Sequence, residues 1–162
     1  LLQYLDTPAR PRPAAGPRPG TMERALSAAP SRAAFRPDPF HGGLFALLPG
    51  DTDQYISSPR AQTRTDADTI ITVRWAGRER ALYFQDGPYF VLDPARGRAE
   101  VVAIYANGFP AAVVASCGAG TVGVVGPHPE ATADWFTDVG LQIPRPLGHD
   151  LGLDLLDRVM RA

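Results

Sequence analysis

The sequence predicts a mixed α/β domain that is rich in strands and ends in two helices. Residues 70–125 contain a row of short apolar runs separated by turns with glycine, which is typical of strands joined by hairpins. Residues 131–161 repeat apolar side chains at helical spacing. With 162 residues, of which 44% are hydrophobic and 20% charged, the chain can form one domain with a hydrophobic core.

Composition divides the chain near residue 43. The first forty residues hold eight of the 17 prolines and six arginines, without a sustained apolar period. Proline removes backbone donors and blocks helices. We therefore interpret residues 1–43 as a mostly irregular Pro/Arg/Ala-rich leader, with one short helix over 22–29. Residues 44–162 form the expected folded domain, which opens with the apolar run 44–48 and continues through a polar connection over 51–68.

The strands are expected to follow one another through short turns. Gly77, Gly108 and the pair Gly118 and Gly120 lie in the gaps between apolar runs, where hairpin turns commonly need glycine. We expect a meander that is antiparallel for much of its length. Its predicted strands are residues 70–75, 80–84, 101–106, 111–116 and 121–125.

Two amphipathic helices complete the predicted domain. The first ends at Gly140, a residue common after a helix. The second is expected to start at Asp150 as its capping residue, and Arg158 and Arg161 suit its C-terminal end. We interpret both apolar faces as core packing; they comprise Ala131, Trp135, Phe136 and Val139 in the first helix, and Leu151, Leu155, Leu156 and Val159 in the second.

Charge and cysteine content limit the classes of partner. The net charge of −1 does not favour binding to nucleic acid or to an anionic membrane. A single cysteine excludes an intramolecular disulfide and a cysteine-based zinc cluster. No apolar stretch reaches the ~18 residues of a membrane span, and no signal peptide is recognisable. We predict a cytoplasmic protein without metal or other cofactor; basic residues that are all arginine suggest a GC-rich bacterial genome.

The segment Gly126-Pro127-His128-Pro129-Glu130 is the best candidate for acid–base chemistry. It follows the last apolar run, and residues i and i+2 of an extended backbone point to the same side. Glu130 could therefore accept a hydrogen bond from one nitrogen of His128, while flanking prolines restrict the backbone. The same spacing also fits an ordinary loop histidine and a carboxylate in the first turn of a helix.

Two further segments are weaker candidates. Asp86, Gly87, Pro88 and Tyr89 form a turn between apolar flanks, which could line a ligand cleft or fold its aromatic ring back into the core. Cys117 lies next to glycines, but a strand follows it. We expect a hairpin there and a structural cysteine, because nothing nearby would activate the thiol.

Four motifs together resemble a known family. In order along the chain they are residues 47–56, 83–90, 105–108 and 124–131. They resemble the family named after the N-terminal domain of biotin-protein ligase, a branch of the class I glutamine amidotransferase superfamily. The likeness extends over residues 44–155.

The resemblance implies a fold and a catalytic triad. The fold would be a flavodoxin-like three-layer α/β sandwich around a largely parallel sheet, with a strand-rich insertion. In a Cys–His–Glu triad, the thiolate attacks a carbonyl, histidine transfers the proton and glutamate orients the histidine. His128 and Glu130 match the last two members, and Asp86 to Phe90 match a loop that faces the pocket.

The nucleophile does not carry over. The family's cysteine lies on an elbow upstream of the segment that starts at Leu47, and nothing between Leu1 and Ala46 reproduces it. The chain therefore resembles the C-terminal portion of such a domain.

We expect an amidotransferase-like domain of unknown substrate that keeps the histidine and glutamate of the triad but is inactive as written. The alternatives are a cysteine amidohydrolase that is active in a full-length form, and a pseudoenzyme that binds a small amide or other ligand. The sequence leaves the oligomeric state open.

Overall fold

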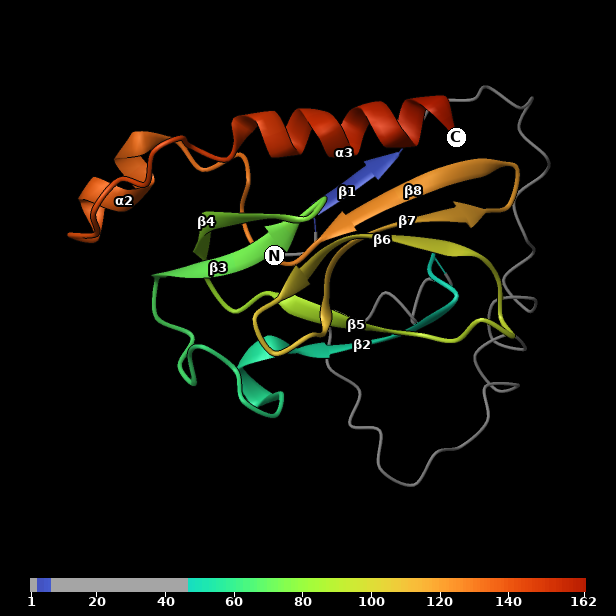
Figure 1. Ribbon diagram of the computed structural model, residues 1–162, viewed down its shortest axis with the longest axis horizontal. Coiled ribbons are helices and arrows are strands. Elements are labelled where there is room, and N and C mark those ends of the chain that lie inside the picture. The colour runs from blue at the N-terminus through green and yellow to red at the C-terminus, as the bar shows by residue number, and fades with distance from the viewer. Residues whose placement is uncertain (1–2, 7–46) are drawn as a thin grey trace, which may run out of the picture.

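The computed structural model describes residues 3–6 and 47–162 (Figure 1). The helix expected over 22–29 and the start of the apolar run at residues 44–46 lie outside the described residues. The elements are β1 (Gln3–Asp6), β2 (Gly50–Gln54), the 3₁₀ turn η2 (Tyr55–Ser57), β3 (Thr69–Trp75), β4 (Arg78–Phe84), β5 (Pro88–Leu92), β6 (Ala99–Tyr105), β7 (Pro110–Cys117), β8 (Gly120–Val125), α2 (Ala133–Asp138) and α3 (His149–Arg161).

The strands form two antiparallel sheets. The larger has six strands in the order β1-β8-β7-β6-β3-β4, and the smaller is the ribbon β2-β5. The strand-rich α/β architecture with two C-terminal helices is therefore confirmed. Every described pair of neighbouring strands is antiparallel, so the parallel sheet implied by the resemblance is not among them. β1, from the expected leader, adds an edge strand beside β8.

The β3–β4 hairpin shows how the sequence determines register. Ala76 and Gly77 both have positive φ, 45° and 85°. Positive φ at both central positions is the signature of a type I′ turn, whose twist matches that of the flanking strands. The turn is therefore two residues long, and Trp75 pairs directly with Arg78.

The polar connection expected over 51–68 is in part a strand. β2 pairs with β5, and Thr52 lies opposite Phe90. Both side chains are buried, whereas Asp53 points to solvent. β2 (Gly-Asp-Thr-Asp-Gln) has no apolar side chain, and its buried Thr52 is polar, so no apolar alternation in the sequence predicts a strand here.

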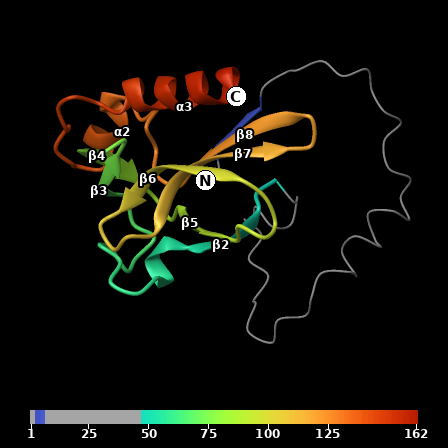
Figure 2. The ribbon, with the colours of Figure 1, turned by 45° about the vertical axis from the view of Figure 1, so that its right-hand side comes forward.

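The large sheet is covered on both faces. α3 packs on one face and the β2–β5 ribbon lies against the other (Figures 1 and 2). A side-chain carbon at Gly123 would lie 2.7 Å from a Val159 methyl and 3.2 Å from Leu155. Glycine at this position of β8 therefore lets α3 approach the sheet closely. On the ribbon side, the buried cluster consists of Leu48, Phe90, Val113, Ala115, Val122 and Val124.

Both predicted helices are present, with one correction at a cap. Asp150 lies inside α3 and does not cap it; Gly148 occupies the N-cap position. The Asp150 carboxylate instead binds the Arg80 guanidinium through two hydrogen bonds of 2.6 and 2.7 Å. This ion pair ties the first turn of α3 to β4.

The helix faces are less buried than expected. Phe136, Leu151, Leu155 and Val159 are buried as predicted, but Trp135, Val139 and Leu156 are about two-fifths exposed. None of the described helices is long and apolar enough to cross a membrane.

Candidate functional site

The predicted site lies in the segment that runs from the end of β8 to the outer edge of β4. After β8 the backbone N–H of Gly126 donates to Ala111 of β7, and that of His128 donates to Tyr83 of β4 at 2.9 Å. His128 and Tyr83 form an antiparallel bridge at the outer edge of β4. The histidine is therefore held by its backbone as well as by its side chain.

The predicted histidine–carboxylate pair is present. Nδ1 of His128 lies 2.9 Å from Oε1 of Glu130. The His128 side chain is only 3% exposed, whereas that of Glu130 is 39% exposed. An ionised carboxylate only accepts hydrogen bonds, so this contact places a proton on Nδ1 and makes Nε2 the basic nitrogen of the neutral ring.

Aromatic rings enclose the imidazole. The ring of Trp135 in α2 has its centroid 5.3 Å from that of His128, and the Tyr83 ring lies 6.0 Å away at an interplanar angle of 71°. Tyr83 also makes edge contacts with Trp135 and Phe136, both at 5.3 Å. These contacts restrict the imidazole to one orientation, and they exclude water from most of its surface.

Tyr83 links this cluster to Asp68. Its hydroxyl donates to Oδ1 of Asp68 at 2.5 Å. Burial, the hydrogen bond to Asp68 and the negative charges of Asp68 and Asp138 raise the pKa of Tyr83 to about 12. The phenol therefore stays protonated at neutral pH and acts as a donor.

The predicted ligand loop packs directly against the histidine segment. A side-chain carbon at Gly87 would lie 2.2 Å from the carbonyl oxygen of Gly126, and one at Gly126 would lie 2.2 Å from the carbonyl oxygen of Pro88. Tyr105 holds this carbonyl group of Pro88 in place, because its buried hydroxyl donates to the Pro88 oxygen at 2.6 Å. Burial, followed by the proximity of Tyr55, raises the pKa of Tyr105 well above its ordinary value. The structure thus brings the two predicted segments together through their backbones.

The side chains of that loop point to separate partners. Asp86 has a positive φ of 44° and accepts a hydrogen bond from the Gln54 amide at 3.0 Å. Tyr89 belongs to β5 and not to a turn, and its ring lies 4.6 Å from that of Phe109. Burial is the main cause of the raised pKa of Tyr89, with a smaller effect from the charge of Asp53. The loop and the histidine segment therefore share a backbone scaffold, while Asp86 binds Gln54 and the Tyr89 ring packs against Phe109.

Cys117 lies at the opposite end of β8. It pairs with Gly120 at the β7–β8 turn, whereas Val125, at the other end of β8, leads to the histidine. A strand of six residues spans roughly 17 Å at the usual rise. The hairpin around the cysteine is as predicted, and the chain's single thiol is out of reach of His128.

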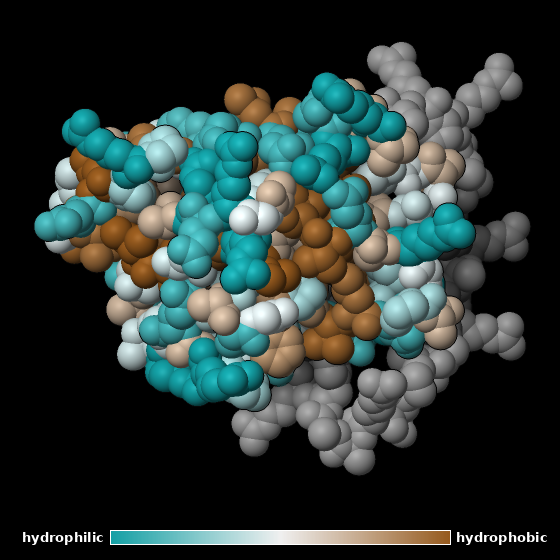
Figure 3. All heavy atoms as spheres, in the orientation of Figure 1, coloured by the Kyte–Doolittle hydropathy of each residue, from teal (hydrophilic) through white to brown (hydrophobic). Residues whose placement is uncertain are grey.

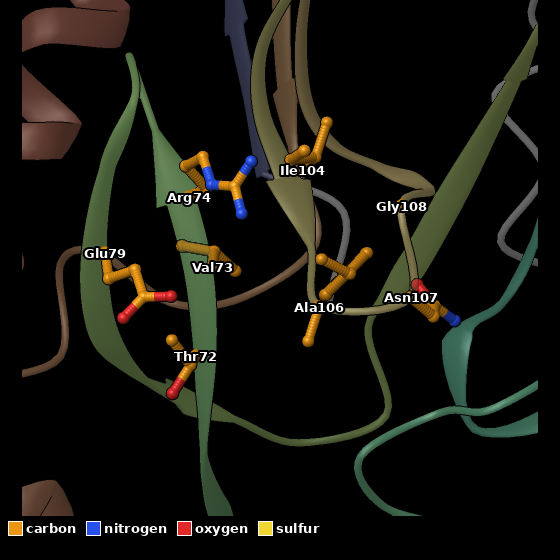
Figure 4. A pocket seen from close by; sticks show the side chains of 9 residues that line it. Thr72, Val73, Arg74, Glu79, Ile104, Ala106, Asn107 and Gly108 are labelled. Atoms are coloured by element: carbon orange, nitrogen blue, oxygen red, sulfur yellow. The ribbon is translucent and has the colours of Figure 1, made fainter.

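A cleft of about 290 Å³ opens elsewhere on the large sheet (Figure 4). It forms where β3 and β6 separate beyond the pair Val73–Tyr105. Thr72 pairs with Ala81 of β4 but not with β6. On that open side the amide of Gln62 can donate to the Thr72 carbonyl at 2.8 Å and accept from the Thr72 N–H at 3.2 Å. The lining residues are Thr72, Val73, Arg74, Glu79, Ile104, Tyr105, Ala106, Asn107 and Gly108, and none is a predicted site residue.

Sequence reasoning missed the residues that surround the imidazole. Tyr83 is distant from His128 in the sequence, and the bridge between β4 and the segment after β8 brings it to the ring, with Asp68 bound to its hydroxyl. Trp135 reaches the ring from α2, seven residues further along the chain. The sequence feature that could have predicted these rings is the aromatic residues just before Gln85 and those within α2. Among residues 3–6 and 47–162, no three histidine, cysteine or acidic side chains are grouped as metal ligands.

No family model, curated protein or solved structure matches the chain. The likeness to the biotin-protein ligase family therefore remains a prediction from the four motifs.

Proposed function

We propose that this chain is an amidotransferase-like domain that keeps the general base and the orienting carboxylate of a Cys–His–Glu triad but lacks the thiol. The single observation that carries the proposal is the 2.9 Å contact between Nδ1 of His128 and Oε1 of Glu130 around a ring that is 3% exposed. The flavodoxin-like fold, the membership of the biotin-protein ligase family and the cytoplasmic location belong to the same proposal.

The pair has the geometry of a general base. Glu130 fixes the tautomer with Nε2 unprotonated, so Nε2 is the atom that would take a proton from a thiol and later return it to a leaving amine. Glu130 would also stabilise the imidazolium formed in that step, and a charge in this buried setting needs such a partner. Its second oxygen, Oε2, is buried and accepts no hydrogen bond from the described residues.

The missing component is the nucleophile. With its single cysteine at the far end of β8, the chain is expected to show no thiol-dependent amide hydrolysis, because a triad without its nucleophile keeps only a small residual rate. A longer form that supplied a cysteine beside Nε2 would be a cysteine amidohydrolase.

Ammonia release from L-glutamine and L-asparagine tests this proposal. We expect no release above the background of a matched His128→Ala variant, and no change on Cys117→Ser. Release that is lost in both variants would contradict the proposal, because it would require Cys117 and His128 to act together.

A second candidate function is ligand binding without turnover, which the 290 Å³ cleft favours. Arg74 and Glu79 line it with opposite charges, which suits a small zwitterion. Titration with L-glutamine by calorimetry would show saturable binding that Arg74→Ala abolishes and Arg98→Ala leaves intact. Absence of heat with either protein would exclude glutamine as this ligand.

A further inference from the structure

The outer face of α3 carries an unusual group of exposed apolar side chains. Leu153 is 66% exposed, Met160 56% and Leu156 38%. They lie at positions i, i+3 and i+7, which places them on one side of the helix, away from the buried Leu155. Apolar side chains break the hydrophilic surface along the edge of the molecule where α3 runs (Figure 3). We call Leu153, Leu156 and Met160 the α3 stripe.

The stripe has the spacing of a helix–helix seam. Apolar residues that alternate at intervals of three and four are those that pack between two helices. The side of α3 that faces the sheet is already satisfied by Leu151, Leu155 and Val159, all buried. The stripe is therefore additional to what the fold of one copy needs.

The charges of α3 are complementary to those of an antiparallel copy. Its first half carries Asp150 and Asp154, and its second half carries Arg158 and Arg161 together with Asp157, so a net negative end faces away from a net positive end. Within one copy Arg158 pairs with Asp154 and Glu100, and Arg161 pairs with Asp157. Antiparallel helices also place opposite ends of their dipoles together. The acidic end of one helix would then meet the basic end of the other, twice by symmetry.

We infer that two copies of this chain associate through an antiparallel contact between their α3 helices. Leu153 of each copy lies opposite Leu156 of the other, and Met160 lies opposite His149. Asp150 keeps a side chain that is 62% exposed although it binds Arg80, and Arg161 is 78% exposed. Arg161 pairs with Asp157 of its own helix at 2.7 Å, and in the dimer its exposed guanidinium also binds Asp150 of the other copy. The interface is isologous, as in most homodimers.

The contact is small, so the dimer is weak. A helix of 13 residues is roughly 20 Å long, and a single helix pair buries less than the ~1,200 Å² of a standard interface. We expect a dissociation constant on the order of 10 μM or weaker.

Sedimentation velocity of the full 162-residue chain tests the inference. Across low micromolar to submillimolar concentrations the sedimentation coefficient should rise from the monomer value to that of a dimer. Leu153→Lys should weaken association by at least roughly tenfold, because it places a charge in the centre of the seam. The matched control is Val91→Lys, which changes a side chain of 46% exposure on β5, away from α3.

The contribution of charged side chains to dimer affinity can be tested separately. Arg161→Glu should weaken the dimer by a few-fold, and added salt should weaken the unchanged dimer in the same direction. Arg98→Glu makes the same charge change at an exposed position outside α3 and should have no effect. Circular dichroism of each variant verifies that the monomer is folded.

Three outcomes would overturn the inference. The chain could remain monomeric at every concentration, it could dimerise equally well with Leu153→Lys, or Val91→Lys could disrupt the dimer as much as Leu153→Lys does. The second and third outcomes would place the interface elsewhere on the molecule. None of these results depends on the proposed function.

Discussion

The two ends of β8 differ in almost every property that catalysis requires. At one end, His128 is buried, hydrogen-bonded through its backbone and its ring, and enclosed by aromatic side chains. At the other end, Cys117 is half-buried at a hairpin turn with open space around Gly118. The His128 imidazole, which could transfer a proton, and the chain's single thiol therefore lie at opposite ends of β8, and the two cannot meet unless β8 unfolds.

The largest expected effect concerns close packing at the histidine end. Gly126→Ala would put a carbon 2.0 Å from the Tyr105 hydroxyl and 2.2 Å from the Pro88 carbonyl oxygen. We expect the free energy of unfolding to fall by roughly 2–4 kcal/mol, because backbone has to move. Gly120→Ala, whose new carbon would meet nothing closer than 3.8 Å, should change it by less than about 1 kcal/mol. Urea denaturation measures both, and equal losses would mean that the two ends are equally packed.

Loss of the carboxylate should have the next largest effect. Glu130→Ala leaves the buried Nδ1–H of His128 without its acceptor, which should lower the free energy of unfolding by about 1–3 kcal/mol. Glu79→Ala removes an exposed carboxylate and is the control, expected within about 0.5 kcal/mol. If both variants unfold at the same urea concentration as the unchanged chain, the His128–Glu130 contact does not stabilise the fold.

The pKa of the Tyr83 hydroxyl gives a pH-dependent test of the structure at the histidine end of β8. Its pKa of about 12 lies above the ordinary value of 10.0, so the folded state holds this proton more tightly than the unfolded chain does. The resulting stabilisation is complete below pH 10 and is lost as pH rises through 12.

Asp68→Asn removes the charge and should move the Tyr83 pKa toward 10.0, as followed by ultraviolet absorbance. Tyr83→Phe identifies that transition among the other tyrosines. An unchanged titration in Asp68→Asn would show that burial alone raises the pKa.

The smallest effect is expected at the cysteine end. Cys117→Ser should change the free energy of unfolding by no more than about 0.5 kcal/mol, because the side chain is half-buried at a turn. Alkylation of Cys117 by iodoacetamide should proceed at the same rate in His128→Ala. A slower rate in that variant would mean that the two ends communicate.

The features that could be predicted from the sequence are those determined by residues close together along the chain. The His128–Glu130 contact was predictable because two residues and two prolines determine it locally. The β3–β4 hairpin was predictable because Gly77 lies between two apolar runs, although its turn is the pair Ala76 and Gly77 and not the four residues 76–79 that the sequence suggested. Whether the pair belongs to an amidotransferase-like triad is a separate question, which rests on the motifs.

Long-range and half-buried features were not predictable in the same way. The role of Asp150 was predicted as a cap, but Arg80, seventy residues away, offers a charged partner and takes the carboxylate. The β2–β5 ribbon was missed because β2 has no apolar side chain; it consists of a glycine, two aspartates, a threonine and a glutamine. The contact between Tyr83 and His128 depends on a bridge between segments 45 residues apart, which no local period records.

The position of the proton on the neutral His128 ring is the most direct test of whether Glu130 orients this imidazole as a base. Long-range ¹H–¹⁵N NMR of the folded chain at neutral to alkaline pH distinguishes the two ring nitrogens, with His41 and His149 assigned by substitution. For the neutral form of the ring we predict a proton on Nδ1 and none on Nε2, and loss of that preference in Glu130→Ala. A ring protonated on Nε2, or one that is unchanged by Glu130→Ala, would contradict the claim that Glu130 orients this imidazole as a base.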